Sequence, residues 1–412
     1  MNGQVETLVV RASRHWDGVS ATPGGPVEVH VRDGSITYVG PRGDGRLADA
    51  PVGEVVELGA RMLLPGFIDC HVHVVDPALS HTTPSHQALG ALPALRTLLD
   101  NGFTTVRDLG CTGHSVTVDL RQAVQDGIVV GPRMIVAPHM LSSRGGHGDK
   151  SGELAAGFGV EVGTLADGPL ELTRAVRVEV RLGADWVKFS ATGGFSSDRD
   201  EPTQTTYTQT EMDALVACAE DMQRPCAVHA MTDQGIRRAV RAGVRSVEHA
   251  NLATPETFDL LTERGVWLVP TRYVAALLTE QLDNDDYWQD KEPELRDKIR
   301  RHTADLRERA GHPGASQVRI AFGTDAGVVP YEDTWREFPA MVDAGITPLR
   351  ALRAATGEAA ALLGRDDIGR IAPGTAADLI ALDGDPFTDI HATGRIAFVL
   401  RRGAVHRRPP SP

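Results

Sequence analysis

The chain has few cysteines, few aromatic residues and no excess of positive charge. Its four cysteines, Cys70, Cys111, Cys218 and Cys226, are scattered over 412 residues without a Cys-x-x-Cys pair, so we expect no disulfide framework. Aspartate and glutamate number 55 against 42 lysines and arginines, which gives a formal charge of −13. This acidic balance argues against a nucleic-acid partner or an anionic membrane.

Long apolar runs are also missing. No stretch reaches the roughly eighteen apolar residues that a membrane span needs. The first residues show no charged segment followed by an apolar one, as a secretion signal would. We therefore predict a cytoplasmic protein. Hydrophobic residues make up 41% and charged residues 24%, which is typical of a globular chain, and the length favours two structural units.

Both ends of the chain resemble short strands. Residues 27–31 alternate apolar and polar side chains, and Asp33-Gly34 separates them from residues 35–39. Asp-Gly between such runs is typical of a β-hairpin. Residues 378–382 and 396–400 repeat this style near the other end. We therefore predict a small β-sandwich domain built from residues 1–62 and 363–412.

Residues 63–362 alternate apolar strands with helical segments. No Gly-x-Gly-x-x-Gly motif follows a strand, which argues against a dinucleotide-binding fold. Eight alternations over about 260 residues favour a (β/α)8 TIM barrel in the α/β class. The expected strands are Met62–Val74, Thr104–Leu109, Met134–Pro138, Trp186–Ala191, Cys226–Ala230, Ser246–Ala250, Val266–Pro270 and Ile320–Asp325.

Metal-ligand residue types stand at the ends of several of these strands. His71 and His73 are two apart, so they share one strand face and can chelate one metal; taken alone, they could also be surface histidines. Lys188 interrupts an apolar strand, which is costly unless the amine is paired, solvated or chemically modified. A carbamate formed from that amine and CO2 could bridge two cations.

Three more polar residues end later strands. His229 and His249 each close a strand, where a hydrogen-bonded core histidine is the plainer interpretation of either one. Asp325 ends the last strand, where aspartate is often a turn residue. All of these positions would meet at the C-terminal mouth of a barrel, where barrel active sites lie. The combined order favours a metal centre.

These motifs carry a family resemblance that spans nearly the whole chain. The sequence resembles the amidohydrolase superfamily in its binuclear form with a carboxylated lysine, and is most similar to the imidazolonepropionase-related, Xaa-Pro dipeptidase-like branch. The motifs are PGFIDCHVH at 65–73, GGHGD at 145–149, VKFSATGG at 187–194, AVHA at 227–230, VEHA at 247–250, FGTDAG at 322–327 and IGRIAPGTAADLIALDGDP at 368–386.

The resemblance implies two divalent metal ions, with zinc as the first choice. His71, His73 and Asp325 would bind the more buried ion, and His229 with His249 the more exposed one. Lys188, carboxylated by CO2, would bridge both. A hydroxide between the metals would attack the substrate carbonyl, and Asp325 would move its proton to the leaving amine. The resemblance also implies a small-molecule substrate and a homo-oligomer.

Two departures from the family pattern concern the substrate. Met231 stands where many relatives have a tyrosine two residues after the fifth-strand histidine, so help for the oxyanion must come from elsewhere. His147 and His139 are the candidates, although each could instead pack or cap its loop. Residues 328–333, which follow FGTDAG, differ from the His-Gly-x-Asn stretch of relatives.

A substrate carboxylate would need a cation or an N–H nest at the mouth. Arg272, beside Tyr273, directly follows the seventh expected strand, and a guanidinium matches a carboxylate well. The amides of Gly193 and Gly194 could assist, and Arg199 is an alternative cation. Arg272 could instead pair with an acidic neighbour on the eighth loop, Glu332 or Asp333.

The leading hypothesis is a metal-dependent amidohydrolase that cleaves the C–N bond of a small N-acyl amino acid or dipeptide. The alternative is a cyclic amide, imidazolone or carbamate/urea hydrolase that uses the same metals. A catalytically silent scaffold is a third hypothesis, and it is disfavoured because every ligand type is present.

Overall fold

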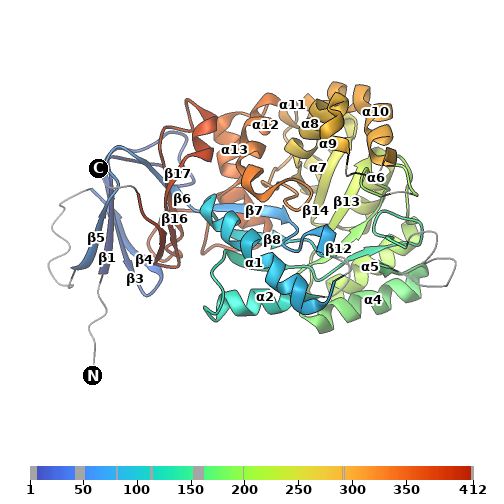
Figure 1. Ribbon diagram of the computed structural model, residues 1–412, viewed down its shortest axis with the longest axis horizontal. Helices are drawn as coiled ribbons and strands as arrows, with labels where there is room; N and C mark the ends of the chain where they lie inside the picture. The colour runs from blue at the N-terminus through green and yellow to red at the C-terminus, as the bar shows by residue number, and fades with distance from the viewer. Residues whose placement is uncertain are drawn as a thin grey trace.

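The computed structural model describes residues 7–41, 52–79, 82–111, 115–151, 162–197, 199–289, 291 and 293–409. Antiparallel pairing dominates the strands of the two chain ends, and parallel strands surrounded by helices form the middle (Figure 1). Strands and helices alternate along that middle part. The predicted α/β class is confirmed.

The chain ends contribute two sheets that share one apolar core. The first has the order β4-β3-β1-β5 and the second β18-β17-β16-β6-β2. Side chains of both sheets, among them Val10, Val29 and Phe398, belong to one buried cluster. The strands are β1 (Thr7–Ala12), β2 (Arg14–His15), β3 (Val27–Arg32), β4 (Ser35–Gly40), β5 (Val52–Glu57), β6 (Met62–Pro65), β16 (Leu379–Leu382), β17 (Ile396–Arg401) and β18 (Ala404–Arg407).

The predicted hairpin at Asp33-Gly34 is present. β3 and β4 pair antiparallel across it, and Asp33 and Gly34 adopt φ angles of 50° and 75°, the left-handed backbone that such a tight turn requires.

The single strand expected at Met62–Val74 is wrong, because it is two strands in two different sheets. β6 pairs antiparallel with β16, whereas β7 (Phe67–Val72) pairs parallel with β8 (Phe103–Asp108). Gly66 lies at the junction, where a Cβ atom would stand 2.2 Å from Oγ1 of Thr104. Only glycine lets the chain pass from one sheet to the other at this point.

The parallel strands form two sheets, β7-β8-β9 and β11-β10-β12-β13-β14-β15. The eighth expected strand, Ile320–Asp325, forms only an isolated bridge, from Ile320 to Leu268. Its backbone still lies between β15 and β7, because Ala321 N–H donates to Leu268 and Cys70 N–H donates to Phe322. The further strands are β9 (Arg133–Val136), β10 (Met140–Ser142), β11 (Thr164–Leu165), β12 (Val187–Ser190), β13 (Cys226–Thr232), β14 (Ser246–Leu252) and β15 (Trp267–Val269).

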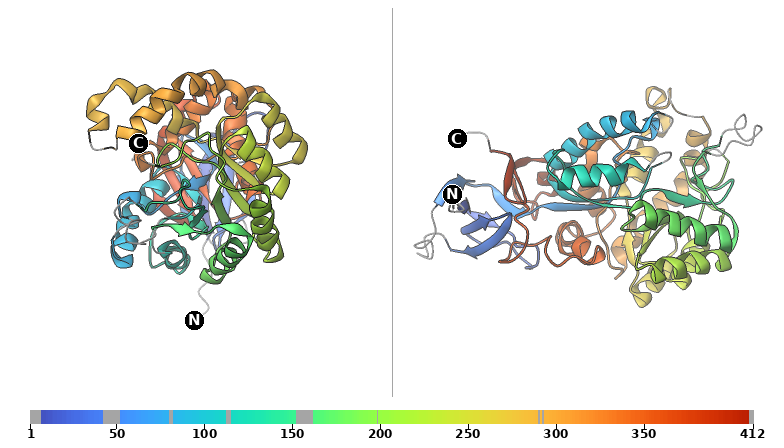
Figure 2. Two further views of the ribbon diagram at one scale, coloured as in Figure 1. Left: turned by 90° about the vertical axis from the view of Figure 1, so that its right-hand side faces the viewer. Right: turned by 90° about the horizontal axis from the view of Figure 1, so that it is seen from below.

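Helices cover the outside of the parallel strands, as Figure 2 shows. A capping box begins α5, where Thr208 and Glu211 exchange both hydrogen bonds. The helices are α1 (Pro84–Asp100), α2 (Val116–Gln125), α4 (Gly168–Leu182), α5 (Gln209–Asp221), α6 (Asp233–Ala242), α7 (Pro255–Arg264), α8 (Arg272–Glu280), α9 (Asp285–Trp288), α10 (Pro293–Glu308), α11 (His312–Ala315), α12 (Glu337–Asp343), α13 (Pro348–Ala354) and α14 (Gly357–Leu362).

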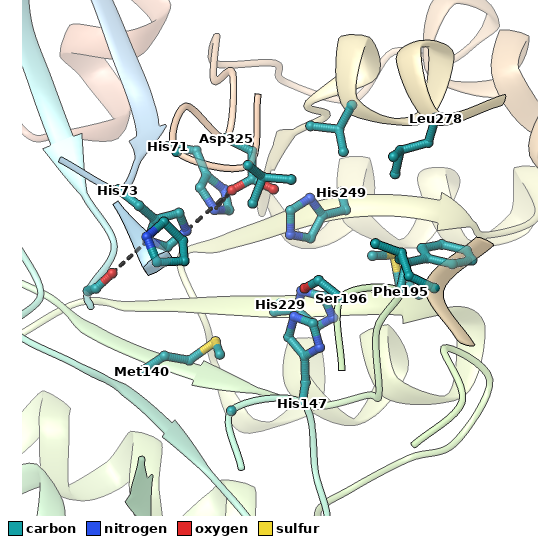
Figure 3. A pocket seen from close by; sticks show the side chains of 18 of the residues that line it. His71, His73, Met140, His147, Phe195, Ser196, His229, His249, Leu278 and Asp325 are labelled. Carbon is teal, nitrogen blue, oxygen red and sulfur yellow. Dashed lines mark hydrogen bonds and ion pairs between the residues drawn. The ribbon is translucent and has the colours of Figure 1, made fainter. Parts of the chain in front are cut away.

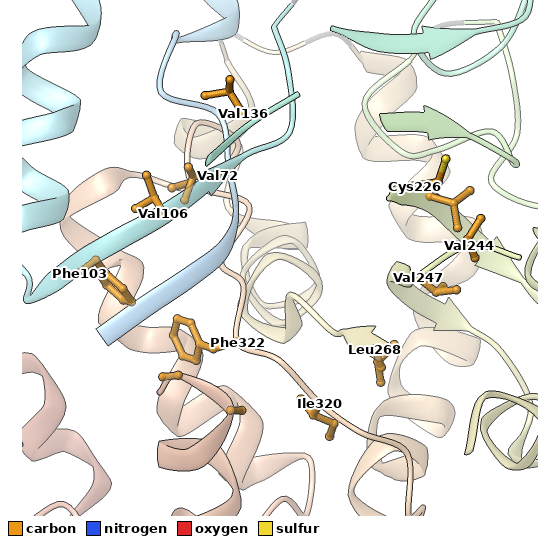
Figure 4. Close-up of a cluster of buried hydrophobic side chains, with 14 of the residues drawn as sticks. Val72, Phe103, Val106, Val136, Cys226, Val244, Val247, Leu268, Ile320 and Phe322 are labelled. Atoms are coloured by element: carbon orange, nitrogen blue, oxygen red, sulfur yellow. The ribbon is translucent and has the colours of Figure 1, made fainter. Parts of the chain in front are cut away.

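An apolar core holds the parallel strands to these helices (Figure 4). Phe103 of β8 packs on Phe322 with ring centroids 5.6 Å apart, and Phe322 packs on Phe338 of α12 at 4.3 Å. This packing fixes residues 320–325 against β7 and β8. Within the described part of the chain, no helix is long and apolar enough to cross a membrane.

Candidate metal centre

The predicted ligands come from five segments and line one cavity of about 360 Å³ (Figure 3). His71 and His73 stand at the C-terminal end of β7. Asp325 ends the segment of residues 320–325, which lies between β15 and β7. Lys188 on β12, His229 on β13 and His249 on β14 complete the set. Parallel strands bring these residues together because their carboxyl ends share one edge.

His71, His73 and Asp325 form a compact group whose ligand atoms all lie within 4.8 Å of one another. Oδ1 of Asp325 is 3.4 Å from Nε2 of His71 and 3.2 Å from Nε2 of His73. Burial alone would raise the pKa of Asp325, but the two histidines lower it to about 2. Two imidazoles and an ionised carboxylate are a donor set that fits a divalent metal such as zinc.

The backbone is strained at two of the six predicted ligands. Asp325 has a φ of 60° and His249 a φ of 71°, which side chains larger than glycine rarely adopt. Asp325 is held in place by its N–H, which donates to His71 O at 2.7 Å. Strain of this kind costs about 1–3 kcal/mol and is concentrated at functional sites.

Hydrogen bonds on the far side of each ring select the nitrogen that faces the cavity. Nδ1 of His73 lies 2.6 Å from Gly110 O, and Nδ1 of His249 lies 2.7 Å from Oγ1 of Thr271. Nε2 of His229 lies 3.1 Å from Gly193 O. These contacts leave Nε2 of His73 and His249 and Nδ1 of His229 for a metal, an orientation typical of ligated histidines.

The amine of Lys188 is buried near the other predicted ligands, since its charge acts on His71, His229, His249 and Asp325. Its side chain is 1% exposed, and Nζ has no hydrogen-bond partner among the described residues. Burial lowers the pKa of Lys188 to about 8, which raises the share of neutral amine that can add CO2. An orphaned buried amine in a cluster of metal-ligand types fits the predicted carbamate bridge.

The other predicted residues divide into two groups. His147 and Met231 line the cavity, and the ring of His147 stacks on that of His229 with centroids 4.2 Å apart. Met231 packs with Phe195 and Leu278 in an apolar cluster. Among the described residues, the lining does not include His139, Arg199, Arg272, Tyr273, Gly193 or Gly194.

Those six residues have other neighbours. His139 turns Nδ1 to Glu179 at 2.8 Å, and Arg199 is exposed. Nη1 of Arg272 donates to Asn251 at 2.7 Å. The expected contact with the eighth loop comes from Tyr273, whose hydroxyl lies 3.4 Å from Asp333. The two glycines contact histidines of the site. Gly193 O faces Nε2 of His229, and Gly194 packs against the ring of His147.

The sequence interpretation missed a buried layer behind the ligands. Nδ1 of His71 lies 2.9 Å from Oε2 of Glu248, and Arg107 lies 3.0 Å from the other oxygen of Glu248. All three are almost fully buried. The available signal was a charged residue directly after an apolar one in a strand, since Arg107 follows Val106 in β8 and Glu248 follows Val247 in β14, as Lys188 follows Val187 in β12.

Comparison with known proteins identifies the family. The amidohydrolase family model covers residues 62–407. The chain is 32% identical to ochratoxinase of Aspergillus niger over 80% of this chain and 72% of that protein. It is 25% identical to imidazolonepropionase of Salinispora tropica over 94% of each. A Xaa-Pro dipeptidase with methionine in its active site superposes with a TM-score of 0.88, at 29% identity, over 98% of this chain and 100% of that one.

The predicted branch is therefore confirmed, and the protein is a hydrolase that acts on C–N bonds. The chain belongs to the amidohydrolase family.

Proposed function

We propose that the protein cleaves the amide or peptide bond of a small N-acyl amino acid or dipeptide at a binuclear metal site. The observation that carries this proposal is the convergence of His71, His73, Asp325, His229 and His249 around the orphaned amine of Lys188. Similarity to a Xaa-Pro dipeptidase structure supports a peptide-like substrate.

His71, His73 and Asp325 would hold one metal ion and His229 and His249 the other, with carboxylated Lys188 between them. Two such ions, with zinc as the proposed metal, would polarise a carbonyl and activate water at neutral pH. The chain supplies the rest. Asp325, ionised in the free protein, would take a proton from the attacking water on a carboxylate oxygen and pass it to the nitrogen of the leaving amine.

The cavity walls support a substrate with an apolar side chain. Beyond the histidines, the lining changes to the apolar cluster of α8 and α10, which includes Leu278 and Ile299, together with Phe195 and Met231. Lys150 also lines the cavity. Its positive charge contributes to lowering the pKa of His147 and of His229. We propose that Lys150, in place of Arg272, binds a free carboxylate of the substrate.

For the fold, we propose that residues 63–362 form a (β/α)8 barrel. Its eight strands would be β7, β8, β9 together with β10, β12, β13, β14, β15 and residues 320–325. The two outer sheets would be the β-sandwich domain of residues 1–62 and 363–412. Cross-strand hydrogen bonds on both sides of residues 320–325 and the shared core of the outer sheets support this division. The homo-oligomer and the cytoplasmic location stay predictions.

A substrate panel tests the function. Purified protein loaded with zinc is assayed for hydrolysis, as amine release from N-acyl amino acids and dipeptides and as ring opening of cyclic ureides and imidazolones. The proposal predicts the highest kcat/KM on acyclic substrates with an apolar side chain. A preference for imidazolones or cyclic ureides would favour the alternative activity instead, which similarity to imidazolonepropionase supports. No hydrolysis of any of these substrates would favour a scaffold.

A further inference from the structure

Lys298 is a buried lysine on α10, a helix in which the only other buried residues are Ile299 and Leu306. Its ammonium lies 3.3 Å from Oδ1 of Asp200, and also donates to the carbonyl oxygens of Gly194 (3.4 Å) and Ser197. All three acceptors belong to the segment that follows β12, of which residues 193–197 and 199–200 are described. Because an unpaired buried charge is costly, these contacts fasten the segment to α10.

Asp200 organises this segment from inside. It is 2% exposed, and its Oδ2 accepts the Gly194 N–H at 3.2 Å. Its Oδ1 accepts the hydroxyl hydrogen of Ser197. A hydroxyl has one hydrogen to donate, and two acceptors face it, Oδ1 of Asp200 and, at 3.5 Å, Gly194 O. Toward its remaining neighbour the oxygen of Ser197 can therefore only accept.

His147 is that remaining neighbour. Its Nδ1 lies 2.9 Å from Oγ of Ser197, and because Oγ is an acceptor here, Nδ1 must carry the hydrogen. A neutral imidazole has one N–H and one lone pair, so Nε2 of His147 holds the lone pair. Among the described residues Nε2 has no hydrogen-bond partner, and His147 lines the cavity (Figure 3).

The same segment also contacts the neighbouring ring. Gly193 O lies 3.1 Å from Nε2 of His229, and the ring of His229 stacks on that of His147. A Cβ atom on Gly194 would stand 2.3 Å from the ring of His147, so this close approach requires glycine. The segment that Lys298 fastens therefore touches both stacked histidines.

We propose that Lys298, Asp200 and Ser197 are positioning residues that keep the hydrogen of His147 on Nδ1, so that Nε2 accepts a hydrogen bond from an N–H of the substrate. Only the identity of that donor rests on the proposed amide hydrolysis. A nitrogen lone pair repels an oxyanion, so His147 in this form binds the substrate nitrogen and does not stabilise the oxyanion.

Nitrogen NMR on the zinc-loaded protein with ¹⁵N-labelled histidines tests the tautomer without turnover. The His147 signals are identified by their loss in His147→Asn. We expect a protonated Nδ1 and an unprotonated Nε2 in the wild type, and loss of this pattern in Ser197→Ala. A protonated Nε2 in the wild type, or unchanged signals in Ser197→Ala, would overturn the proposal.

Matched amides test the donor. Ser197→Ala should lower kcat/KM by about 5- to 150-fold on a secondary amide, and much less on its N-methylated analogue, which has no N–H. Lys298→Met should act in the same direction, whereas Arg300→Met, which removes an exposed cation of α10, should change neither. Equal losses on both amides would contradict the proposal. Failure of every amide as a substrate would reject the proposed function but leave the NMR result to judge the tautomer.

Discussion

Glu248 links His71, a proposed metal ligand, to a buried arginine. Its Oε2 lies 2.9 Å from Nδ1 of His71, and its Oε1 lies 3.0 Å from Nη2 of Arg107. The carboxylate therefore keeps the hydrogen of His71 on Nδ1 and leaves Nε2 for a metal. A carboxylate behind a histidine also makes that histidine a stronger ligand.

Glu248→Gln should weaken metal binding by about 10- to 100-fold, the usual cost of losing such a partner. Competition with a chelator measures the affinity, and the melting temperature of the metal-free protein separates it from a loss of stability. The matched control is Glu28→Gln. Glu28 is also buried and bonded to a histidine, His30, but both lie on β3, far from the cavity lining. Unchanged affinity in Glu248→Gln would reject this role.

The convergence of the proposed ligand residues on one cavity could be predicted from the sequence because their signal is local. His71 and His73 share a strand face by spacing alone, and Lys188 stands out in an apolar strand. Pairings across the fold carry no such signal. Glu248 and Arg107 lie 141 positions apart, and Lys298 and Asp200 98 positions apart, so their contacts appear only once the strands are assembled.

The same limit explains where the strand prediction failed. The apolar run at Met62–Val74 shows no period that separates β6 from β7, and the break at Gly66 depends on Thr104 of a neighbouring strand. Arg272 stands near a strand end as predicted, yet Asn251 on β14 holds its guanidinium. Position along a strand did not reveal that neighbour.

Lys188→Ala should lose the bridging ligand, because a methyl group cannot hold two cations. We expect less bound metal and most of the activity lost, with partial recovery on adding acetate or propionate in place of the carbamate. Carbon NMR after growth in ¹³C-bicarbonate should show a carbamate signal in the wild type and none in Lys188→Ala. Lys298→Met, which removes a buried lysine paired with Asp200, should keep the signal. Full metal occupancy and rate in Lys188→Ala would refute the bridge.

Lys150→Met should weaken substrates with a free carboxylate by about 10- to 150-fold in kcat/KM, the value of a charge-assisted hydrogen bond. Their amidated analogues should be spared, because they carry no charge for Lys150 to meet. Arg272→Met is the comparison, since Arg272 lies outside the described cavity lining and should affect both substrate types alike. If Arg272→Met weakened only the substrates with a free carboxylate and Lys150→Met affected both types alike, Arg272 would be the carboxylate-binding residue.

Asp325→Asn should keep most of the metal but lower kcat by about 10²–10⁴-fold, the usual contribution of a general base. Asparagine retains an oxygen ligand of the same shape and cannot take a proton. Steady-state kinetics with metal analysis on the same sample measure both quantities. A kcat within a few-fold of the wild type would remove Asp325 from proton transfer.

The metal content of the active protein tests the central claim most directly. We predict two divalent ions per chain by elemental analysis of protein purified with zinc present, and activity that disappears on chelation and returns with the metal. An active protein that retains no metal after chelation would contradict the binuclear hydrolase.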